Sequence, residues 1–307
     1  MLIMLSSLLK LCSNDQFYRC AVNQLQLGLT SLDFGSVEEC VEALDSNKLA
    51  CFELYIGSDF KEEALSVLKQ ITQDRGIEIT CVSTLAKLAQ AESDIDVHLN
   101  LIDLSFKVAK SLGVKKIGFM YGGSARLNRF DSQKRFLARI MPLLQKAESS
   151  GITILIENVF SRSPSGDLDS AEVVAELFDS LDSEAIKLNF DVGNFSIAGE
   201  EAYPYAFETL KEIIGGIHLK DVSRYQTARH GNIPISEVLL DYKRGLFIPE
   251  ALGEGIMNSA GLIDSLLTWE DCPPIILEFH CNGDSRSNLL SSNLNYIYRS
   301  MKDVHGH

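Results

Sequence analysis

Four side chains that could bind a metal ion stand where short apolar runs end. Each run is rich in Val, Ile and Leu, as expected of a buried strand, and an ionised carboxylate there is costly unless something compensates it. Three carboxylates and one imidazole form a ligand set for a divalent cation, and they suit Mn²⁺, Mg²⁺ or Co²⁺ better than a structural zinc site, with catalytic Zn²⁺ left open. The four are Glu157 in ITILIEN (152–158), Asp191 in IKLNFDV (186–192), His218 in GGIHLKD (215–221) and Glu278 in PIILEFH (274–280).

Alternating apolar and amphipathic stretches surround these four runs. Eight apolar runs predict strands, at about 23–30, 49–55, 77–83, 115–120, 152–157, 186–191, 214–220 and 274–280. Helix-like stretches lie between them, and eight βα units in series favour a single-domain (β/α)8 TIM barrel. In such a barrel the carboxyl ends of the strands meet at one face, so the four side chains should converge there. A doubly wound open sheet is the alternative, but no glycine-rich phosphate turn follows the first strand.

Composition and charge limit which molecules the protein can bind and where in the cell it is expected. The chain has 307 residues and a formal net charge of −14, which opposes binding to nucleic acid or to an anionic membrane. Its seven cysteines form no close CxxC pair, which favours a reducing, cytoplasmic location. The apolar segment 1–19 lacks a basic start and is interrupted by Lys10. We therefore expect 1–19 to be an extension that packs on the barrel and 20–307 to be the barrel itself.

The same segments resemble a known family, the xylose isomerase-like TIM barrels of the sugar phosphate isomerase/epimerase group. The motifs are IEN with Glu157, FDVGNF with Asp191, IHLKD with His218 and LEF with Glu278, together with AKSLGVKKI (109–117) and ALGEGIMNSAGLIDSL (251–266). The resemblance covers nearly the whole chain from about residue 20. It implies one divalent metal ion, Mn²⁺ first, held by the Glu, Asp, His, Glu set. It also implies a small carbohydrate substrate, and it leaves a homo-oligomer open.

The ligand set suits proton transfer beside a carbonyl. A metal that chelates the carbonyl and a neighbouring hydroxyl stabilises the enediolate formed when the intervening C–H is lost. By resemblance to ketose 3-epimerases, Glu157 and Glu278 would be the catalytic pair, while Asp191 and His218 would mainly hold the ion. One departure concerns Asn194, because those epimerases carry His at this position. Asn cannot titrate near neutral pH but can bond a substrate oxygen.

The long segment after His218 gathers cations in an acidic protein. It contains Lys220, Arg224, Arg229 and His230. One reading is a lid whose cations bind a polar or anionic substrate. The other is a solvated surface loop or a contact between subunits. Of these cations, Lys220 faces the same way as His218, and we expect Lys220 and Arg224 to bind substrate.

Two further positions are weaker candidates. His280, two residues after Glu278, is expected to face the site and bind substrate. Asn194 is also expected to bind substrate. Glu53 ends the second strand, where it is as apt to be a helix cap as a substrate contact.

The expected function is therefore a metal-dependent isomerase or epimerase of a small sugar, sugar phosphate or hydroxy-ketone. A metal-dependent dehydratase of an inosose-like keto-polyol is the alternative, because water could be lost after the same proton abstraction. A barrel that binds sugar or metal without turnover is a third reading. An apurinic endonuclease of the same barrel type would need a His-rich metal cluster and a basic groove, which six His and a net charge of −14 do not supply.

Overall fold

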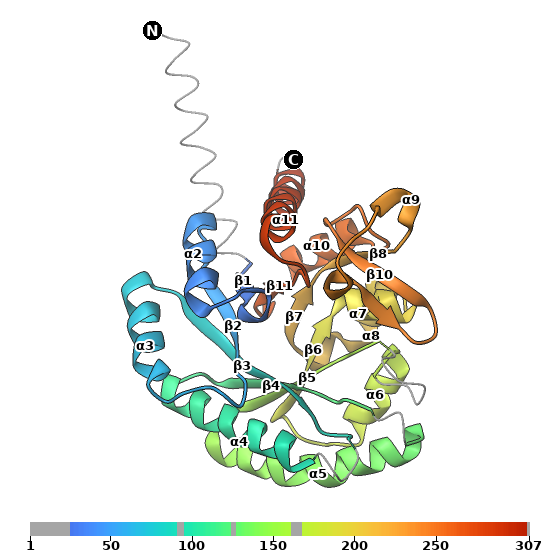
Figure 1. Ribbon diagram of the computed structural model, residues 1–307. Helices are drawn as coiled ribbons and strands as arrows, with labels where there is room; N and C mark the ends of the chain where they lie inside the picture. The colour runs from blue at the N-terminus through green and yellow to red at the C-terminus, as the bar shows by residue number, and fades with distance from the viewer. Residues whose placement is uncertain (1–24, 91–94, 124–126, 161–167, 306–307) are drawn as a thin grey trace.

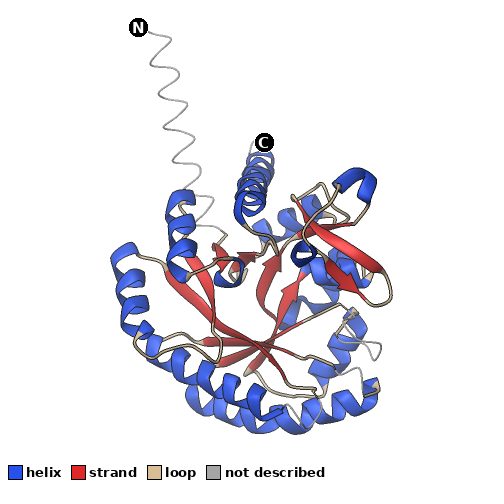
Figure 2. Ribbon diagram, viewed as in Figure 1, coloured by secondary structure: helices blue, strands red, loops and turns tan. Residues whose placement is uncertain are grey.

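A computed structural model describes residues 25–90, 95–123, 127–160 and 168–305, and within them parallel strands close into one barrel (Figures 1 and 2). Their order around the barrel is β1-β11-β7-β6-β5-β4-β3-β2. The predicted single-domain TIM barrel is confirmed. The extension 1–19 lies outside the described residues, so its packing stays a prediction. The barrel strands are β1 (Leu27–Thr30), β2 (Cys51–Tyr55), β3 (Glu78–Lys87), β4 (Lys116–Met120), β5 (Thr153–Glu157), β6 (Ile186–Asp191), β7 (Ile214–Leu219) and β11 (Ile275–Leu277).

Amphipathic helices cover the outside of the barrel (Figure 1). Capping groups stand at their ends: the Ser36 hydroxyl accepts the Glu39 N–H at 3.2 Å, and Gly151 ends α5 with φ +61°. One apolar core joins strands and helices, with Phe52, Phe136 and Phe207 fully buried in it. The outer helices are α2 (Val37–Asn47), α3 (Ala64–Arg75), α4 (Ile95–Leu112), α5 (Arg129–Ser150), α6 (Ala171–Asp179), α8 (Phe207–Leu210), α10 (Ser259–Thr268) and α11 (Gly283–His305).

Three segments differ from the sequence-based expectation. Before β7 the chain forms a π turn (Ala202–Ala206), α8 and a 3-10 turn (Lys211–Ile213) in place of one continuous helix, with Tyr203 in an extended conformation (φ −142°, ψ 131°). A short helix that was not expected, α7 (Val192–Ala198), follows β6 and is buried along its whole length. The last strand is shorter than expected, so Glu278 lies directly after β11.

The long segment after His218 forms a small antiparallel sheet in place of an irregular loop. Its strand order is β8-β10-β9, and it lies beside the carboxyl ends of β6 and β7 (Figure 1). The elements of this sheet region are β8 (Asp221–Arg224), α9 (Thr227–His230), a 3-10 turn (Ile235–Glu237), β9 (Leu239–Asp241) and β10 (Gly245–Glu250).

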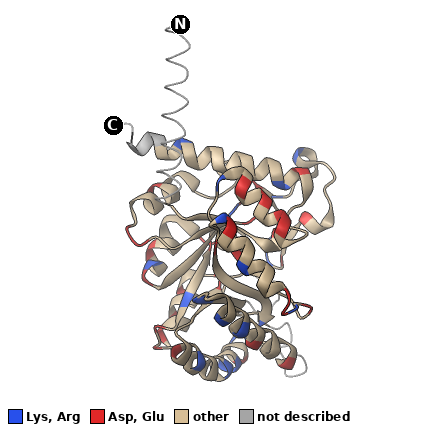
Figure 3. Cartoon of the chain, turned by 90° about the vertical axis from the view of Figure 1, so that its left-hand side faces the viewer, with Lys and Arg blue, Asp and Glu red and all other residues tan. Residues whose placement is uncertain are grey.

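Charges of both signs lie along the outer helices, as Figure 3 shows for one side of the molecule. No helix among the described residues is both long and apolar enough to cross a bilayer.

Candidate metal centre

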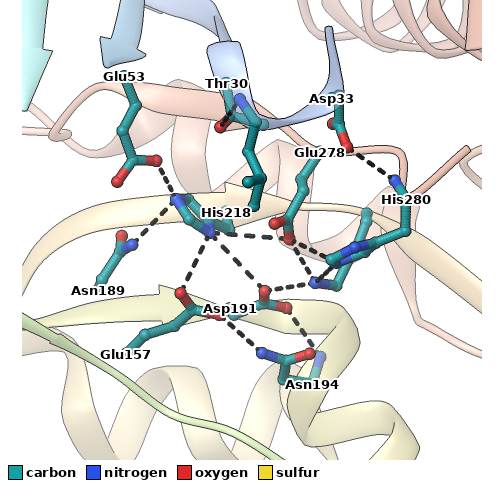
Figure 4. Close-up of polar contacts among 12 residues, drawn as sticks. Thr30, Asp33, Glu53, Glu157, Asn189, Asp191, Asn194, His218, Glu278 and His280 are labelled. Atoms are coloured by element: carbon teal, nitrogen blue, oxygen red, sulfur yellow. Dashed lines mark hydrogen bonds and ion pairs between the residues drawn. The ribbon is translucent and has the colours of Figure 1, made fainter. Parts of the chain in front are cut away.

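The strand register brings Glu157, Asp191, His218 and Glu278 to one point at the carboxyl end of the barrel (Figure 4). Asp191 pairs with His218 between β6 and β7, and Ile276, two residues before Glu278, pairs with His218 between β7 and β11. One oxygen or nitrogen from each of the four side chains lies within 4.8 Å of the others, and all four are buried. The predicted convergence is confirmed, while the roles of the four as ligands stay predictions.

The His218 ring is oriented by a hydrogen-bonded shell beneath it. Its Nε2 lies 2.5 Å from Oε2 of Glu53 and 2.9 Å from Nδ2 of Asn189. The Ser83 hydroxyl donates to the other oxygen of Glu53. The carboxylate therefore fixes the ring with Nδ1 on the opposite side, towards the acidic residues.

The Nδ1 atom of His218 has no hydrogen-bond partner among the described residues, although it is buried. It lies 3.8 Å from Oε2 of Glu157, 3.8 Å from Oδ2 of Asp191 and 3.8 Å from Oε2 of Glu278. A buried ring nitrogen without a partner is unfavourable unless an additional group satisfies it. Three equidistant carboxylate oxygens define where that group would lie.

Lys220 supplies an internal cation to the cluster. Its ammonium is buried, 2.7 Å from Oδ2 of Asp191, and it also donates to Oε2 of Glu278. The space for its chain depends on Gly193 of α7, where a Cβ would lie 2.4 Å from Cγ of Lys220. Lys220 thus bridges two of the carboxylates.

His280 joins the cluster from the turn after β11. Its Nε2 lies 2.9 Å from Nζ of Lys220 and 3.2 Å from Oε2 of Glu278, and the side chain is 21% exposed. His280 is thus the partly exposed member of this group. Its predicted contact with substrate is compatible with that position and stays a prediction.

Two asparagines fix Glu157 and Asp191. The Asn158 side chain bonds the backbone of Asp191 twice, accepting its N–H at 2.7 Å and donating to its carbonyl at 2.8 Å. Asp191 caps α7 by accepting the Asn194 N–H at 2.8 Å. The Asn194 amide donates to Oε1 of Glu157 at 2.9 Å. Asn194 therefore positions the carboxylate of Glu157, and its predicted contact with substrate is not tested.

Burial and neighbouring charges move the pKa values of the carboxyl groups apart. Burial raises the pKa of Glu157 to about 8, against a smaller opposing effect of His218. It also raises the pKa of Asp191, although Lys220 opposes it. For Glu278, burial is outweighed by His280 and Lys220, which together hold its pKa well below the usual range.

The two basic groups of the cluster are held in their protonated forms. Burial alone would lower the pKa of His218, but the carboxylates of Glu53, Glu157 and Glu278 raise it well above its ordinary value. Burial would likewise lower the pKa of Lys220, and Asp191 and Glu278 raise it instead. The cluster therefore compensates its own negative charge with an imidazolium and an ammonium.

The donor set fits a divalent cation. Three carboxylate oxygens face an imidazole nitrogen that has no other partner, and oxygen donors with one nitrogen suit Mn²⁺, Mg²⁺, Co²⁺ or catalytic Zn²⁺. Glu53 supplies the hydrogen bond that a metal-bound His makes with its second ring nitrogen. Glu157, Asp191, His218 and Glu278 would therefore hold the ion.

Sequence comparison assigns the family. The family model described as xylose isomerase-like TIM barrel matches residues 32–299. The chain belongs to this family. The expected resemblance is thus confirmed. Among curated protein sequences, none matches the chain significantly.

Solved structures of xylose isomerase-like barrels share the fold at low sequence identity. The probable 3-DHS dehydratase AsbF from Bacillus anthracis has a TM-score of 0.69 and 18% identity, over 89% of this chain and 98% of that one. The IOLI protein with a binding zinc atom has a TM-score of 0.68 and 15% identity, over 91% and 98%. The 3-keto-D-glucoside 4-epimerase YcjR from E. coli has a TM-score of 0.67 and 14% identity, over 89% and 98%.

Arg224 is the one predicted site residue that the structure does not bring to the cluster. It is exposed on β8, where its guanidinium donates to the carbonyl of Arg244 at 3.2 Å and lies 5.5 Å from the centre of the Phe247 ring. Its predicted contact with substrate is unsupported by these partners and stays a prediction.

The other cations of the expected lid are engaged with acidic partners. Arg229 lies 3.1 Å from Oε1 of Glu250 and His230 lies 3.4 Å from the same atom. In this xylose isomerase-like barrel these contacts hold α9 against β10. They are contacts within a folded accessory sheet, and both the lid reading and the surface-loop reading stay predictions.

Three residues of the site were missed or undervalued from sequence. Glu53 was considered only as a cap or a substrate contact, yet it orients His218. Asn189 lies two residues before Asp191, so strand alternation could have placed it on the same inward face. Asp33, whose carboxylate accepts the N–H groups of Phe279 and His280, carries no local signal because its partners lie far away in sequence.

Proposed function

We propose that this xylose isomerase-like barrel is a divalent-metal-dependent isomerase or epimerase of a small sugar, sugar phosphate or hydroxy-ketone. The observation that carries the proposal is the Nδ1 atom of His218, buried without a partner and 3.8 Å from an oxygen of each of three carboxylates. Mn²⁺ is the proposed ion. The zinc-containing neighbour and the epimerase among the similar structures support this reading through the shared fold.

A divalent cation held by the four residues would supply positive charge that stabilises the anion formed when a C–H beside a carbonyl loses its proton. Glu157 and Glu278 come from β5 and from the end of β11, with β6 and β7 between them. Two carboxyl groups so separated can address opposite faces of a substrate. That arrangement is what inversion at one carbon requires, because the proton must leave from one face and return to the other.

The environments of the two carboxyl groups assign their roles. Lys220 and His280 keep Glu278 ionised, so Glu278 is the base that accepts the C–H proton. Burial raises the pKa of Glu157 to about 8 in the metal-free protein, so of the two carboxyl groups Glu157 takes up a proton more readily, and we assign to it the proton transfer at the opposite face. The amide of Asn194, 2.9 Å from Oε1 of Glu157, fixes the direction of that transfer. Asp191 and His218 hold the ion and move no proton of the substrate.

The test is a panel of ketoses, ketose phosphates and inososes with added Mn²⁺, followed by NMR in D₂O. Deuterium should enter the product at the carbon beside the carbonyl. Glu157→Gln and Glu278→Gln should each lower turnover by about 10²-fold or more while the protein stays folded. The matched control is Glu208→Gln, on the exposed side of α8, which should keep full activity. Mn²⁺ binding without turnover on any substrate would favour a barrel that binds without catalysis.

A dehydratase is the second candidate, and one contact favours it. Loss of water needs a proton donor for the departing hydroxyl, and His280 is partly exposed and lies beside Glu278, with Nε2 3.2 Å from Oε2 of that residue. The similar fold of a probable dehydratase is consistent with this reading. An enone absorbance that rises in the ultraviolet during turnover would identify the dehydratase. Cytoplasmic location and self-association remain predictions.

A further inference from the structure

The turn after β11 holds His280 in an uncommon backbone conformation. Its φ is +49°, in the left-handed region that residues with a Cβ rarely adopt. This conformation turns the imidazole back towards the cluster, with Nε2 3.2 Å from Oε2 of Glu278 and 2.9 Å from Nζ of Lys220. A turn of this kind persists only where its surroundings hold it in place.

Asp33, which lies near the other end of the chain, holds this turn in place through hydrogen bonds. Its two carboxylate oxygens accept the N–H of Phe279 at 2.7 Å and the N–H of His280 at 3.0 Å, and Figure 4 shows the second of these bonds. These are the two residues that follow Glu278. Asp33 is buried, with 6% exposure, and lies in the 3-10 turn Ser31–Asp33 directly after β1, the neighbour of β11 in the barrel.

Asp33 is itself anchored by Arg286. The guanidinium donates to the Asp33 carbonyl at 2.5 Å, lies 4.1 Å from the centre of the Phe34 ring, and bonds the carboxylate of Glu39. Phe34 and Glu39 belong to the segment after β1, and Arg286 belongs to α11. The segment after β1 is therefore tied to the segment after β11 both at Asp33 and at Arg286.

We propose that Asp33 is a positioning residue of the candidate metal centre. Asp33 holds the strained Phe279–His280 turn and thereby sets where the side chains of Glu278 and His280 lie. It does this through the backbone N–H groups of the two residues that follow Glu278. The functional consequence, that Asp33 controls metal affinity and proton transfer at Glu278, rests on the proposed function.

A metal-independent experiment tests the positioning itself. Asp33→Ala should speed amide exchange at Phe279 and His280 by tenfold or more and should shift the ¹⁵N resonances of the His280 ring, because the ring leaves Glu278 and Lys220. The matched control is Asp241→Ala, which removes another buried carboxylate that accepts two backbone N–H groups, those of Lys243 and Arg244. It lies in the β9–β10 turn and should leave both signals unchanged. Unchanged His280 resonances in Asp33→Ala would overturn the proposal.

A second variant tests whether Asp33→Ala destabilises the protein through the strained backbone of His280 or through a general loss of stability. Gly adopts positive φ without cost, so His280→Gly relieves the turn that Asp33 holds. Asp33→Ala should then lower the melting temperature clearly less in the His280→Gly background than in the natural protein. An equal loss in both backgrounds would show that Asp33 does not hold the strained turn, and would overturn that part of the inference.

Mn²⁺ titration of the full chain then tests whether the turn after β11 controls the metal affinity of the candidate metal centre. Asp33→Ala should weaken Mn²⁺ binding by about tenfold or more, whereas Asp241→Ala should leave it within twofold of the natural protein. If Asp33→Ala changes the His280 resonances but leaves Mn²⁺ affinity unchanged, control of the metal site is excluded. If the natural protein itself binds no Mn²⁺, the proposed function fails, and the exchange and resonance data decide the positioning role separately.

Discussion

His218 Nε2 lies 2.5 Å from Oε2 of Glu53, although the two residues are 165 positions apart in the sequence. This contact decides which ring nitrogen faces the three carboxylates, because a proton shared with Glu53 leaves Nδ1 free to act as a ligand. The bond crosses the top of the barrel from β7 to β2. The geometry of the candidate metal centre thus depends on a residue outside the ligand set.

Replacing Glu53 should therefore weaken metal binding. Glu53→Gln keeps the shape but removes the charge that orients and polarises His218, and outer carboxylates of this kind typically change metal affinity by about 10- to 100-fold. Titration with Mn²⁺ measures the effect. Glu78→Gln, on the exposed start of β3, is the matched control and should bind Mn²⁺ normally. Equal affinities for Glu53→Gln and the control would contradict the assigned role.

Metal binding should release a proton, and affinity should rise with pH. The carboxylates around His218 raise its pKa well above the ordinary value, so the metal-free ring is an imidazolium at neutral pH and must lose a proton before Nδ1 can bind a cation. Affinity should therefore increase by about tenfold per pH unit up to the pKa of His218. Below that pKa, added protons compete with the ion.

Calorimetry in buffers of different ionisation enthalpy counts the protons released. A value of at least one at pH 7 is expected, because His218 is an imidazolium in the metal-free protein and must lose its proton to bind the ion, and Glu157, whose pKa burial raises to about 8, must lose its proton as well. A value near zero would show that neither group is protonated in the metal-free protein.

Sequence alone predicted those features of the fold that depend on residues close together in the chain. The strands are runs rich in Val, Ile and Leu, and the four proposed ligands stand at strand ends that a barrel must bring together. These features follow from periodicity and from closure of the sheet. They required no knowledge of which residues touch across the barrel.

The remaining features depend on contacts between distant segments. The bond from Glu53 to His218 joins residues 165 positions apart, and the bond from Asp33 to the turn after Glu278 joins residues 246 positions apart. Helix α7 was missed because a short helix buried on all sides shows no polar face. The sheet β8-β10-β9 was taken for a loop because its strands are short and turn signals are frequent there.

Asp221 is expected to anchor that sheet to the barrel. Its carboxylate accepts N–H groups of Gly253 at 3.0 Å and Met257 at 3.1 Å, and the Ser259 hydroxyl at 3.0 Å. Asp221→Ala leaves these donors without an acceptor and should lower the free energy of unfolding by about 2–4 kcal/mol. Urea unfolding measures the loss. Asp264→Ala, at an exposed position of α10, is the control, and a similar small effect in both variants would contradict the anchor.

Replacing Lys220 should lower the free energy of unfolding most when no metal is bound. Its buried ammonium lies 2.7 Å from Asp191 and also bonds Glu278, so Lys220→Met leaves two buried carboxylates with less compensating charge. Removing one partner of a buried ion pair typically costs about 3–5 kcal/mol. We expect a loss of this order in the free energy of unfolding of metal-free protein.

Added Mn²⁺ should restore much of that loss, because a divalent cation supplies positive charge to the same carboxylates and binds only the folded chain. The measurement is urea unfolding of natural protein and Lys220→Met, each with excess EDTA and with saturating Mn²⁺. Lys187→Met is the control, since the ammonium of Lys187 is partly exposed and pairs with Glu184 at 2.9 Å. Its small effect should be the same with and without metal. If the loss in Lys220→Met is equally large under both conditions, then the cation and the ammonium do not serve the same carboxylates, and the proposed ligand set is wrong.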